Sequence, residues 1–179
     1  VVNLRMARVL VSGVSGPIGA ALLPKLKASG AHITRLIRGN STHAASDEQA
    51  ISWDPAQPIA ADLVSGFDAV IHLAGETIVG RWTVEKKSRI RESRVIGTRN
   101  LAEALGQAKD KPQAFVCSSA IGYYGDRGEE LLNEKSAPGT GFLADVCVEW
   151  EQATRPAAIA GIRTVQTVSY THLTLPTIL

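Results

Sequence analysis

A glycine-rich turn near the start of the chain stands between a short apolar run and an amphipathic segment. Residues 7–12 are apolar and rich in β-formers, and residues 18–29 carry apolar side chains at helical spacing. The sequence between them is Gly13-Val14-Ser15-Gly16-Pro17-Ile18-Gly19. Three glycines alone are a weak signal, but a glycine turn that joins a strand directly to a helix is typical of a phosphate-holding loop.

The expected role of this turn follows from the chemistry of a helix start. Backbone N–H groups there donate to phosphate oxygens, and the helix dipole stabilises the negative charge. Glycine at 13 serves the tight turn, glycine at 16 allows close approach of the ligand, and glycine at 19 lets the helix pack closely on the strand. A purely structural turn is the alternative. The predicted dinucleotide-binding residues of the turn are Gly13, Ser15, Gly16, Pro17, Ile18 and Gly19.

Strand-like and helix-like segments alternate along the rest of the chain. Strands are expected at 32–37, 50–53, 69–74, 115–119 and from 161, helices at 84–108 and 142–154, and a loop at 40–49. The run 69–74 is almost continuously apolar, as expected for a strand that is buried on both faces. The alternation predicts an α/β fold with a Rossmann-type doubly wound parallel sheet.

The end of the second expected strand distinguishes two cofactors. NAD-binding domains place Asp or Glu there for the ribose 2′-hydroxyl, whereas NADP-binding domains place Arg near the 2′-phosphate. This chain reads Arg35-Leu36-Ile37-Arg38-Gly39-Asn40, without an acid. Because Arg38 can offer a planar fork of donors to a phosphate, we predict NADP(H) in preference to NAD(H). The alternative is that Arg38 is an ordinary surface residue and that the protein does not discriminate between NADP(H) and NAD(H).

Composition excludes several classes of protein. The chain has 179 residues, of which 45% are hydrophobic and 20% charged, as in one folded domain with a sizeable core. A net charge of +2 predicts no nucleic-acid partner. We interpret the basic run 86–99 as a solvated helix face rather than an anion site. No apolar stretch reaches the roughly 18 residues of a membrane span, so no membrane partner is expected.

The two cysteines and the chain ends give further expectations. Cys117 and Cys147 are expected to be buried reduced thiols, no metal site is predicted, and the location is expected to be cytoplasmic. Residues 1–5 precede the only methionine and are interpreted as upstream read-through. Residues 168–179 look like a translated sequencing adapter and are expected to lie outside the fold. The Rossmann domain is therefore predicted over 6–167, ending within its sixth strand.

Several motifs carry a resemblance to a known superfamily. The turn Gly13–Gly19, the sequence LAGE at 73–76 and the sequence SSAIGYYG at 118–125 resemble the extended short-chain dehydrogenases/reductases. With Arg81-Trp82 and the stretches 93–98 and 142–151, they resemble an atypical branch, the NAD-dependent epimerase/dehydratase proteins. The resemblance implies a Rossmann domain followed by a C-terminal substrate domain, which we expect to be missing from this chain.

The resemblance also implies ligands. A nicotinamide dinucleotide and a small-molecule substrate are expected, sugar-like compounds being candidates for the latter. The oligomeric state is left open. The further cofactor contacts that the resemblance implies are Leu73, Ala74, Gly75 and Ser118.

The set of catalytic residues that the resemblance implies is only partly present in this sequence. The superfamily uses a Tyr-x-x-x-Lys pair with a Ser, in which the lysine lowers the pKa of the tyrosine. The segment 142–151, where the pair is expected, has neither residue. Ser119 aligns with the catalytic serine, with a strand-end hydrogen bond as the alternative. Tyr124 and Glu76 are candidate acid–base groups, with turn packing and a loop hydrogen bond as alternatives, and His72 is interpreted as a core residue.

Two functions are compatible with these residues. The first is an NAD(P)(H)-dependent oxidoreductase or epimerase of the atypical short-chain dehydrogenase/reductase type. The alternative is a catalytically silent NADP(H)-binding regulatory or sensor protein, which the missing Tyr and Lys favour more than the fold alone would. We prefer the first function, an enzyme, and leave open which reaction it catalyses.

Overall fold

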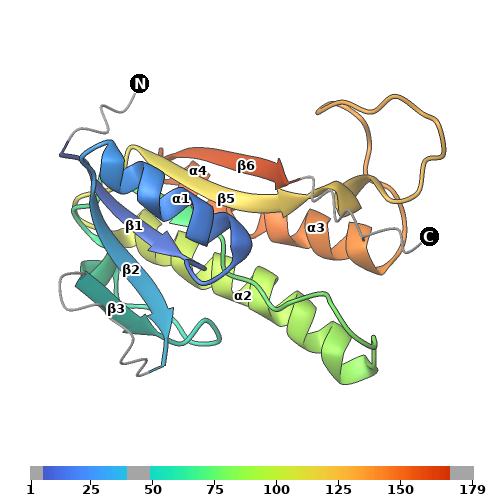
Figure 1. The fold of residues 1–179 in the computed structure, drawn as a ribbon, viewed down its shortest axis with the longest axis horizontal. Helices are drawn as coiled ribbons and strands as arrows, with labels where there is room; N and C mark the ends of the chain where they lie inside the picture. Colours follow the sequence, from blue (N-terminus) through green and yellow to red (C-terminus); the bar gives the residue numbers. More distant parts are fainter. Residues whose placement is uncertain (1–5, 40–48, 170–179) are drawn as a thin grey trace.

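A six-stranded sheet forms the centre of the computed structural model, which describes residues 6–39 and 49–169 (Figure 1). The strands are β1 (Arg8–Ser12), β2 (His32–Arg38), β3 (Gln49–Trp53), β4 (Ala69–His72), β5 (Ala114–Ala120) and β6 (Arg163–Ser169). Neighbouring strands are all parallel, in the order β3-β2-β1-β4-β5-β6. The predicted α/β fold with a Rossmann-type parallel sheet is confirmed.

Helices cover the two faces of this sheet. They are α1 (Pro17–Ala28), α2 (Val84–Gln107), α3 (Phe142–Gln152) and α4 (Arg155–Ile159), with short 3-10 turns η1 (Ala61–Val64) and η2 (Ile121–Tyr124). The long α2 packs against both α3 and α4, and α1 lies over the opposite face (Figure 1). Thr83 caps the start of α2 by accepting a hydrogen bond from the Lys86 N–H at 3.2 Å.

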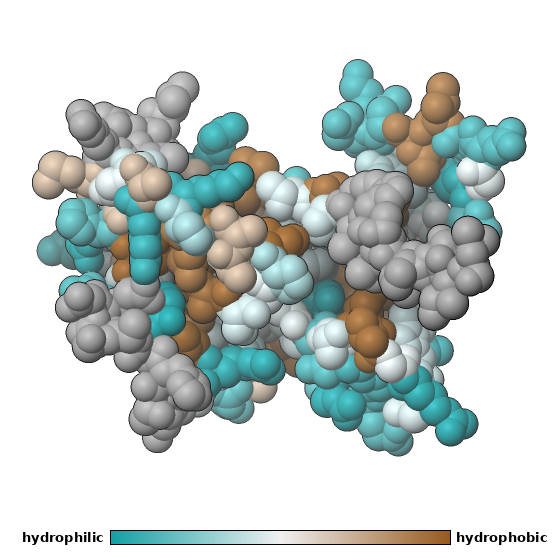
Figure 2. All heavy atoms as spheres, viewed as in Figure 1, coloured by the Kyte–Doolittle hydropathy of each residue, from teal (hydrophilic) through white to brown (hydrophobic). Residues whose placement is uncertain are grey.

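Alternate side chains of the central strand β1 enter two separate cores. Leu10 joins the larger core beneath α2, α3 and α4. Val9 and Val11 join the smaller core with Leu26 of α1. All three β1 side chains are fully buried, as the continuous apolar run requires. The smaller core is covered less completely: Ile71 is only partly buried, and Figure 2 shows hydrophobic residues at the surface among hydrophilic ones.

Two boundaries differ from the sequence expectation for clear reasons. β4 ends at His72 rather than at residue 74, because the chain then leaves the sheet and is held by α2 instead. The helix expected over 142–154 ends at Gln152, and a separate short helix follows. Pro156 in that second helix has no N–H to continue the hydrogen-bond series of α3.

The last strand runs further than expected. β6 extends to Ser169, and its final residues Val168 and Ser169 pair with Ser119 and Ala120 of β5. Residues 1–5, 40–48 and 170–179 lie outside the described residues, so the interpretations of the chain ends and of the loop fall largely there. The domain bounds 6–167 stay a prediction.

Candidate functional site

The glycine turn places the start of α1 at the carboxyl edge of the sheet. The Gly16 N–H donates to the Gly13 carbonyl at 3.1 Å and closes the turn. Gly16 is then the N-cap of α1, and Pro17 is its first residue. N–H groups in the first turn of a helix have no carbonyl partner within the helix. The turn therefore presents free donors and the positive end of the helix dipole beside the ends of the parallel strands.

The three glycines differ in what a side chain would meet. A Cβ at Gly13, where φ is +74°, would lie 2.4 Å from the backbone carbonyl carbon of Leu73. A Cβ at Gly19 would lie 2.5 Å from the Gly13 carbonyl oxygen, so this glycine serves packing on the turn itself. At Gly16 the φ is −77° and the nearest atom would lie at an ordinary 3.4 Å. The protein itself therefore requires glycine at 13 and 19, and the space beside Gly16 remains for a ligand.

A hollow of about 460 Å³ opens beside this turn, across the carboxyl ends of β1, β2, β3 and β4. Its volume lies within the range of ligand clefts, roughly 300–1,000 Å³. The predicted cofactor residues that line it are Gly13, Ser15, Gly16, Arg38, Leu73, Ala74 and Gly75. Those that do not line it are Pro17, Ile18, Gly19 and Ser118. The lining residues that were not singled out from the sequence as cofactor contacts are Val14, Arg35, Leu36, Ile37, Trp53, Pro55 and Ser93.

The charge of the lining fits an anionic dinucleotide. Arg35 and Arg38 of β2 both line the hollow, and Arg38 is exposed. None of the described lining residues is acidic. The open space at Gly16, the start of α1 and the two guanidinium groups together provide donors for phosphate groups. The residues present therefore fit a nicotinamide dinucleotide.

The segment that follows β4 is held by α2. The Glu76 N–H donates to Ser93 Oγ at 2.9 Å, and Arg94 Nη1 donates to the Glu76 carbonyl at 3.0 Å. The Glu76 carboxylate accepts a hydrogen bond from Lys86 Nζ at 2.7 Å and lies 3.9 Å from Arg89 Nε. The hydrogen bond from Lys86 holds the pKa of Glu76 below its usual value. Glu76 is thus a charged acceptor at neutral pH.

The interpretation of the basic run 86–99 as a solvated helix face is wrong for two of its members. Lys86 is only 8% exposed, and its ammonium group contacts Glu76. The guanidinium of Arg94 is half-buried and lies 5.2 Å from the ring of Trp150. Arg91 and Arg99 are exposed, as expected. The error arises because the start of α2 runs beside the segment after β4, so part of its charged face meets protein instead of water.

Ser119 and Tyr124 have contacts of their own. Ser119 is buried, and its Oγ donates to Oε1 of Glu151 on α3 at 2.5 Å. Tyr124 ends η2, with its ring edge-on to Tyr123 at a centroid distance of 5.2 Å. No hydrogen bond within the described residues joins Ser119, Tyr124 and Glu76. The group that contacts Ser119 is Glu151, which the sequence offered only as part of a family motif.

His72 lies in the core, as interpreted from the sequence. Its ring is fully buried near Trp53 and Phe115, and its Nδ1 pairs with Ser12 Oγ at 2.6 Å. The Nε2 atom is buried and makes no hydrogen bond within the described residues. Burial lowers the pKa of His72 to about 4, so the imidazole is neutral at pH 7. Trp53, which lies edge-on to the His72 ring, also lines the hollow.

The two cysteines are free and buried, as predicted. Burial raises the pKa of both thiols, to about 12 for Cys117. Within residues 6–39 and 49–169, no three His, Cys, Asp or Glu side chains gather as a metal site would require. No helix in these same ranges has the length and apolarity needed to cross a membrane.

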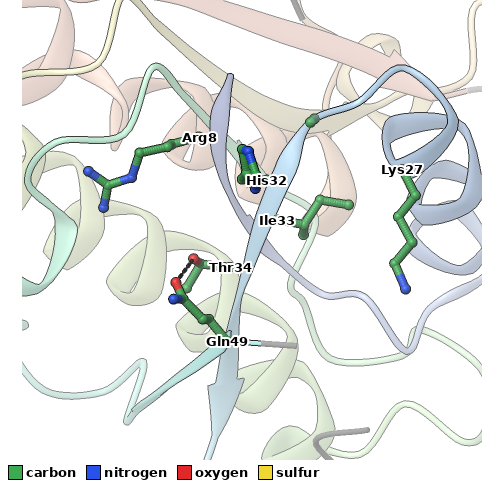
Figure 3. A pocket seen from close by; sticks show the side chains of 7 residues that line it. Arg8, Lys27, His32, Ile33, Thr34 and Gln49 are labelled. Carbon is green, nitrogen blue, oxygen red and sulfur yellow. Dashed lines mark hydrogen bonds between the residues drawn. The ribbon is translucent and has the colours of Figure 1, made fainter. Parts of the chain in front are cut away.

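A second hollow, of about 660 Å³, lies at the opposite edge of the sheet, where β1, β2 and β3 begin. Figure 3 shows Arg8 and Lys27 on opposite sides of the strands, with His32 between them. Their side chains do not converge on a common point (Figure 3). Thr34 Oγ1 donates to Gln49 Oε1 at 3.3 Å, within the wall. The helix α1 meets this edge with its carboxyl end, which carries the negative end of the helix dipole, so the candidate site is the hollow at the carboxyl edge of the sheet.

Comparison with known proteins gives a consistent result. A model of the NAD dependent epimerase/dehydratase family matches residues 9–150. An epimerase family protein of Mycobacterium leprae is 36% identical over 163 residues, which cover 90% of this chain and 51% of that protein. The chain therefore spans about half the length of the curated relatives it matches.

Two solved structures share the fold and part of the sequence. The nucleoside-diphosphate sugar epimerase from Corynebacterium glutamicum superposes with a TM-score of 0.76 at 36% identity, covering 92% of this chain and 34% of that one. The human epimerase family protein SDR39U1 (isoform 2), solved with NADPH, gives a TM-score of 0.74 at 29% identity, covering 90% and 52%.

Proposed function

The chain belongs to the NAD dependent epimerase/dehydratase family, and on that premise we propose that it binds NADP(H), in preference to NAD(H), in the hollow beside Gly16. The observation that carries the preference is Arg38, the last residue of β2, which is exposed in a described lining without any acid. A guanidinium can donate two parallel hydrogen bonds to a 2′-phosphate. The NADPH held by the human neighbour supports this choice.

The proposed contacts come from both sides of the hollow. The start of α1, from Ser15 to Ile18, takes the pyrophosphate, with Gly13 and Gly19 giving the turn its shape. The backbone of 73–75 forms the facing wall, and Ser118 of β5, outside the described lining, is the remaining proposed contact. When bound, the dinucleotide supplies hydride transfer.

We also propose an epimerase-like or other oxidoreductase reaction on a small substrate, of the atypical short-chain dehydrogenase/reductase type. The nucleoside-diphosphate sugar epimerase among the structural neighbours supports a sugar-like substrate. Glu76, Ser119 and Tyr124 are the candidates for handling protons. Lys86 keeps the Glu76 carboxylate ionised and lowers its basicity, so its acceptor role is to hydrogen-bond a substrate hydroxyl, and Ser119 is oriented by Glu151. A cytoplasmic location completes the proposal and is supported by two free, buried thiols.

A second function is favoured by one observation. The helix α3, over Phe142–Gln152, contains neither Tyr nor Lys, so the superfamily's usual proton-exchanging pair is missing from it. A protein that binds NADP(H) without turning it over, and thereby senses or regulates, is consistent with that helix.

Two measurements test these proposals in order. Fluorescence titration of the purified chain with NADPH and NADH should show tighter binding of NADPH. Equal affinities would contradict the assigned role of Arg38. A carbonyl panel is then added to the NADPH complex while the absorbance of the reduced nicotinamide is followed. Oxidation supports the enzyme, and tight binding without oxidation across the panel supports the sensor.

A further inference from the structure

The guanidinium of Arg94 lies directly behind a wall of the hollow. A Cβ built on Gly75, which lines the hollow, would lie 3.2 Å from Arg94 Cζ. On its other side the guanidinium faces the ring of Trp150 at 5.2 Å. Nη1 donates to the carbonyls of Glu76 at 3.0 Å and Ile90 at 3.2 Å. These contacts fix a positive charge one backbone layer away from the proposed dinucleotide.

Among the described residues the charge of Arg94 forms no ion pair, and the Glu76 carboxylate acts on it only at a distance. The nearby Glu76 carboxylate is already engaged by Lys86 at 2.7 Å. The Cys147 thiol is also close, but burial raises its pKa, so it stays neutral at pH 7. A half-buried cation without an ion-pair partner of its own is costly, because burial removes part of its hydration.

We propose that the dinucleotide is the counter-charge of Arg94: this residue positions the wall at Gly75 and attracts the anionic cofactor across it. The inference rests on the proposed function, because it assumes that a nicotinamide dinucleotide occupies the hollow. At an effective dielectric constant of about 20, a positive charge one backbone layer behind an anion can change affinity about tenfold. Arg94 acts through the Gly75 backbone and is therefore a positioning residue rather than a catalytic one.

The test compares three variants by NADPH binding. Arg94→Gln removes the charge, Arg94→Lys keeps it, and Arg99→Gln removes an exposed charge from the same helix as a matched control. Energy transfer from tryptophan to NADPH gives the dissociation constant, since Trp53 lines the hollow. We expect Arg94→Gln to weaken NADPH binding at least about tenfold, with Arg94→Lys and Arg99→Gln within about threefold of the parent chain.

A salt series separates charge from mere structure. Attraction across the wall predicts that log Kd depends less steeply on log salt in Arg94→Gln than in the parent chain. If Arg94→Gln binds NADPH as the parent does, the inference is overturned. It is also overturned if Arg94→Gln and Arg94→Lys are equally weak with an unchanged salt slope. Should Arg94→Gln fail to fold, Arg94→Met, which also removes the charge but keeps a long side chain, takes its place under the same two criteria.

The proposed function fails in a different way. If the parent chain binds neither NADPH nor NADH, the cofactor assignment itself is wrong. If the parent binds NADPH and only the Arg94 comparison fails, the cofactor assignment stands and the role of Arg94 falls.

Discussion

Glu76 and Lys86 form an ion pair that joins the segment after β4 to the first turn of α2. Lys86 Nζ lies 2.7 Å from Glu76 Oε1, although the residues are ten positions apart in the sequence. Together with Ser93 and Arg94, this pair fixes the path of the chain along one wall of the hollow. The part of the site that follows β4 is therefore built by α2 rather than by the sheet.

Replacing Lys86 by Met should lower the free energy of unfolding by about 1 kcal/mol at pH 7. Because the folded pKa of Glu76 lies below its usual 4.5, the pair stabilises the fold above that pH and loses its effect as the pH falls through the folded pKa. Urea unfolding at pH 7 and at a series of lower pH values measures the difference. The exposed Lys111→Met is the control, and a deficit that does not shrink as the pH falls would contradict the ion-pair explanation.

Substitutions at the three glycines of the turn should affect stability and NADPH binding differently. Gly13→Ala and Gly19→Ala should each cost more than about 1 kcal/mol of stability, because their Cβ atoms would meet backbone at 2.4 and 2.5 Å. Gly16→Ala should change stability by less than about 0.5 kcal/mol yet weaken NADPH binding about tenfold or more. Thermal unfolding and NADPH titration test this, and a Gly16→Ala variant with parental affinity would argue against a phosphate at that position.

The stability of the protein should fall between pH 6.5 and pH 4 because of His72. Unfolded His72 takes up a proton near pH 6.5, whereas the folded residue does so only near pH 4. The unfolded state therefore binds more protons in this window, and about 3 kcal/mol is lost by its lower end. Urea unfolding across the window should show a flatter pH dependence for His72→Gln. The exposed His32→Gln should keep the parental slope, and equal slopes in all three chains would refute the assignment.

Arg38 should select the cofactor. Arg38→Ser removes charge-assisted hydrogen bonds worth roughly 1.5–3 kcal/mol, so NADPH affinity should fall about 10- to 100-fold. NADH, which has no 2′-phosphate, should bind as before. Calorimetric titration of both cofactors gives the two constants, with the exposed Arg163→Ser as control. A parallel loss for NADH would indicate damage to the hollow instead of lost phosphate recognition.

Features with a local cause could be predicted from the sequence. The strand-to-helix turn at Gly13–Gly19 and the alternation of strands and helices depend on near neighbours, so the parallel sheet followed from them. The end of β6 could not be predicted, because Ser169 is held by pairing with Ala120, which is 49 positions earlier. Hydrophobic pattern gives an expected strand, but partner strands decide where it stops.

The polar contacts of the site were harder to predict for a related reason. Helical spacing groups the basic residues of α2 on faces, but it does not say which protein surface each face meets. Lys86 and Arg94 are directed at the segment after β4 only because α2 packs alongside it. Likewise, Ser119 meets Glu151 through the packing of α3 on β5, across 32 positions of sequence.

The strand order also has a consequence for how the chain is made on the ribosome. β1 emerges first and occupies the middle of the sheet; β2 and β3 then extend one side, and β4, β5 and β6 the other. Each new strand thus finds its neighbour already synthesised. The described lining of the hollow lies between Gly13 and Ser93, so all of its residues are synthesised while β5 and β6 are still unmade. At about 5–20 residues per second, a nascent chain spends several seconds in that state. The hollow therefore belongs to the half of the sheet that is synthesised first.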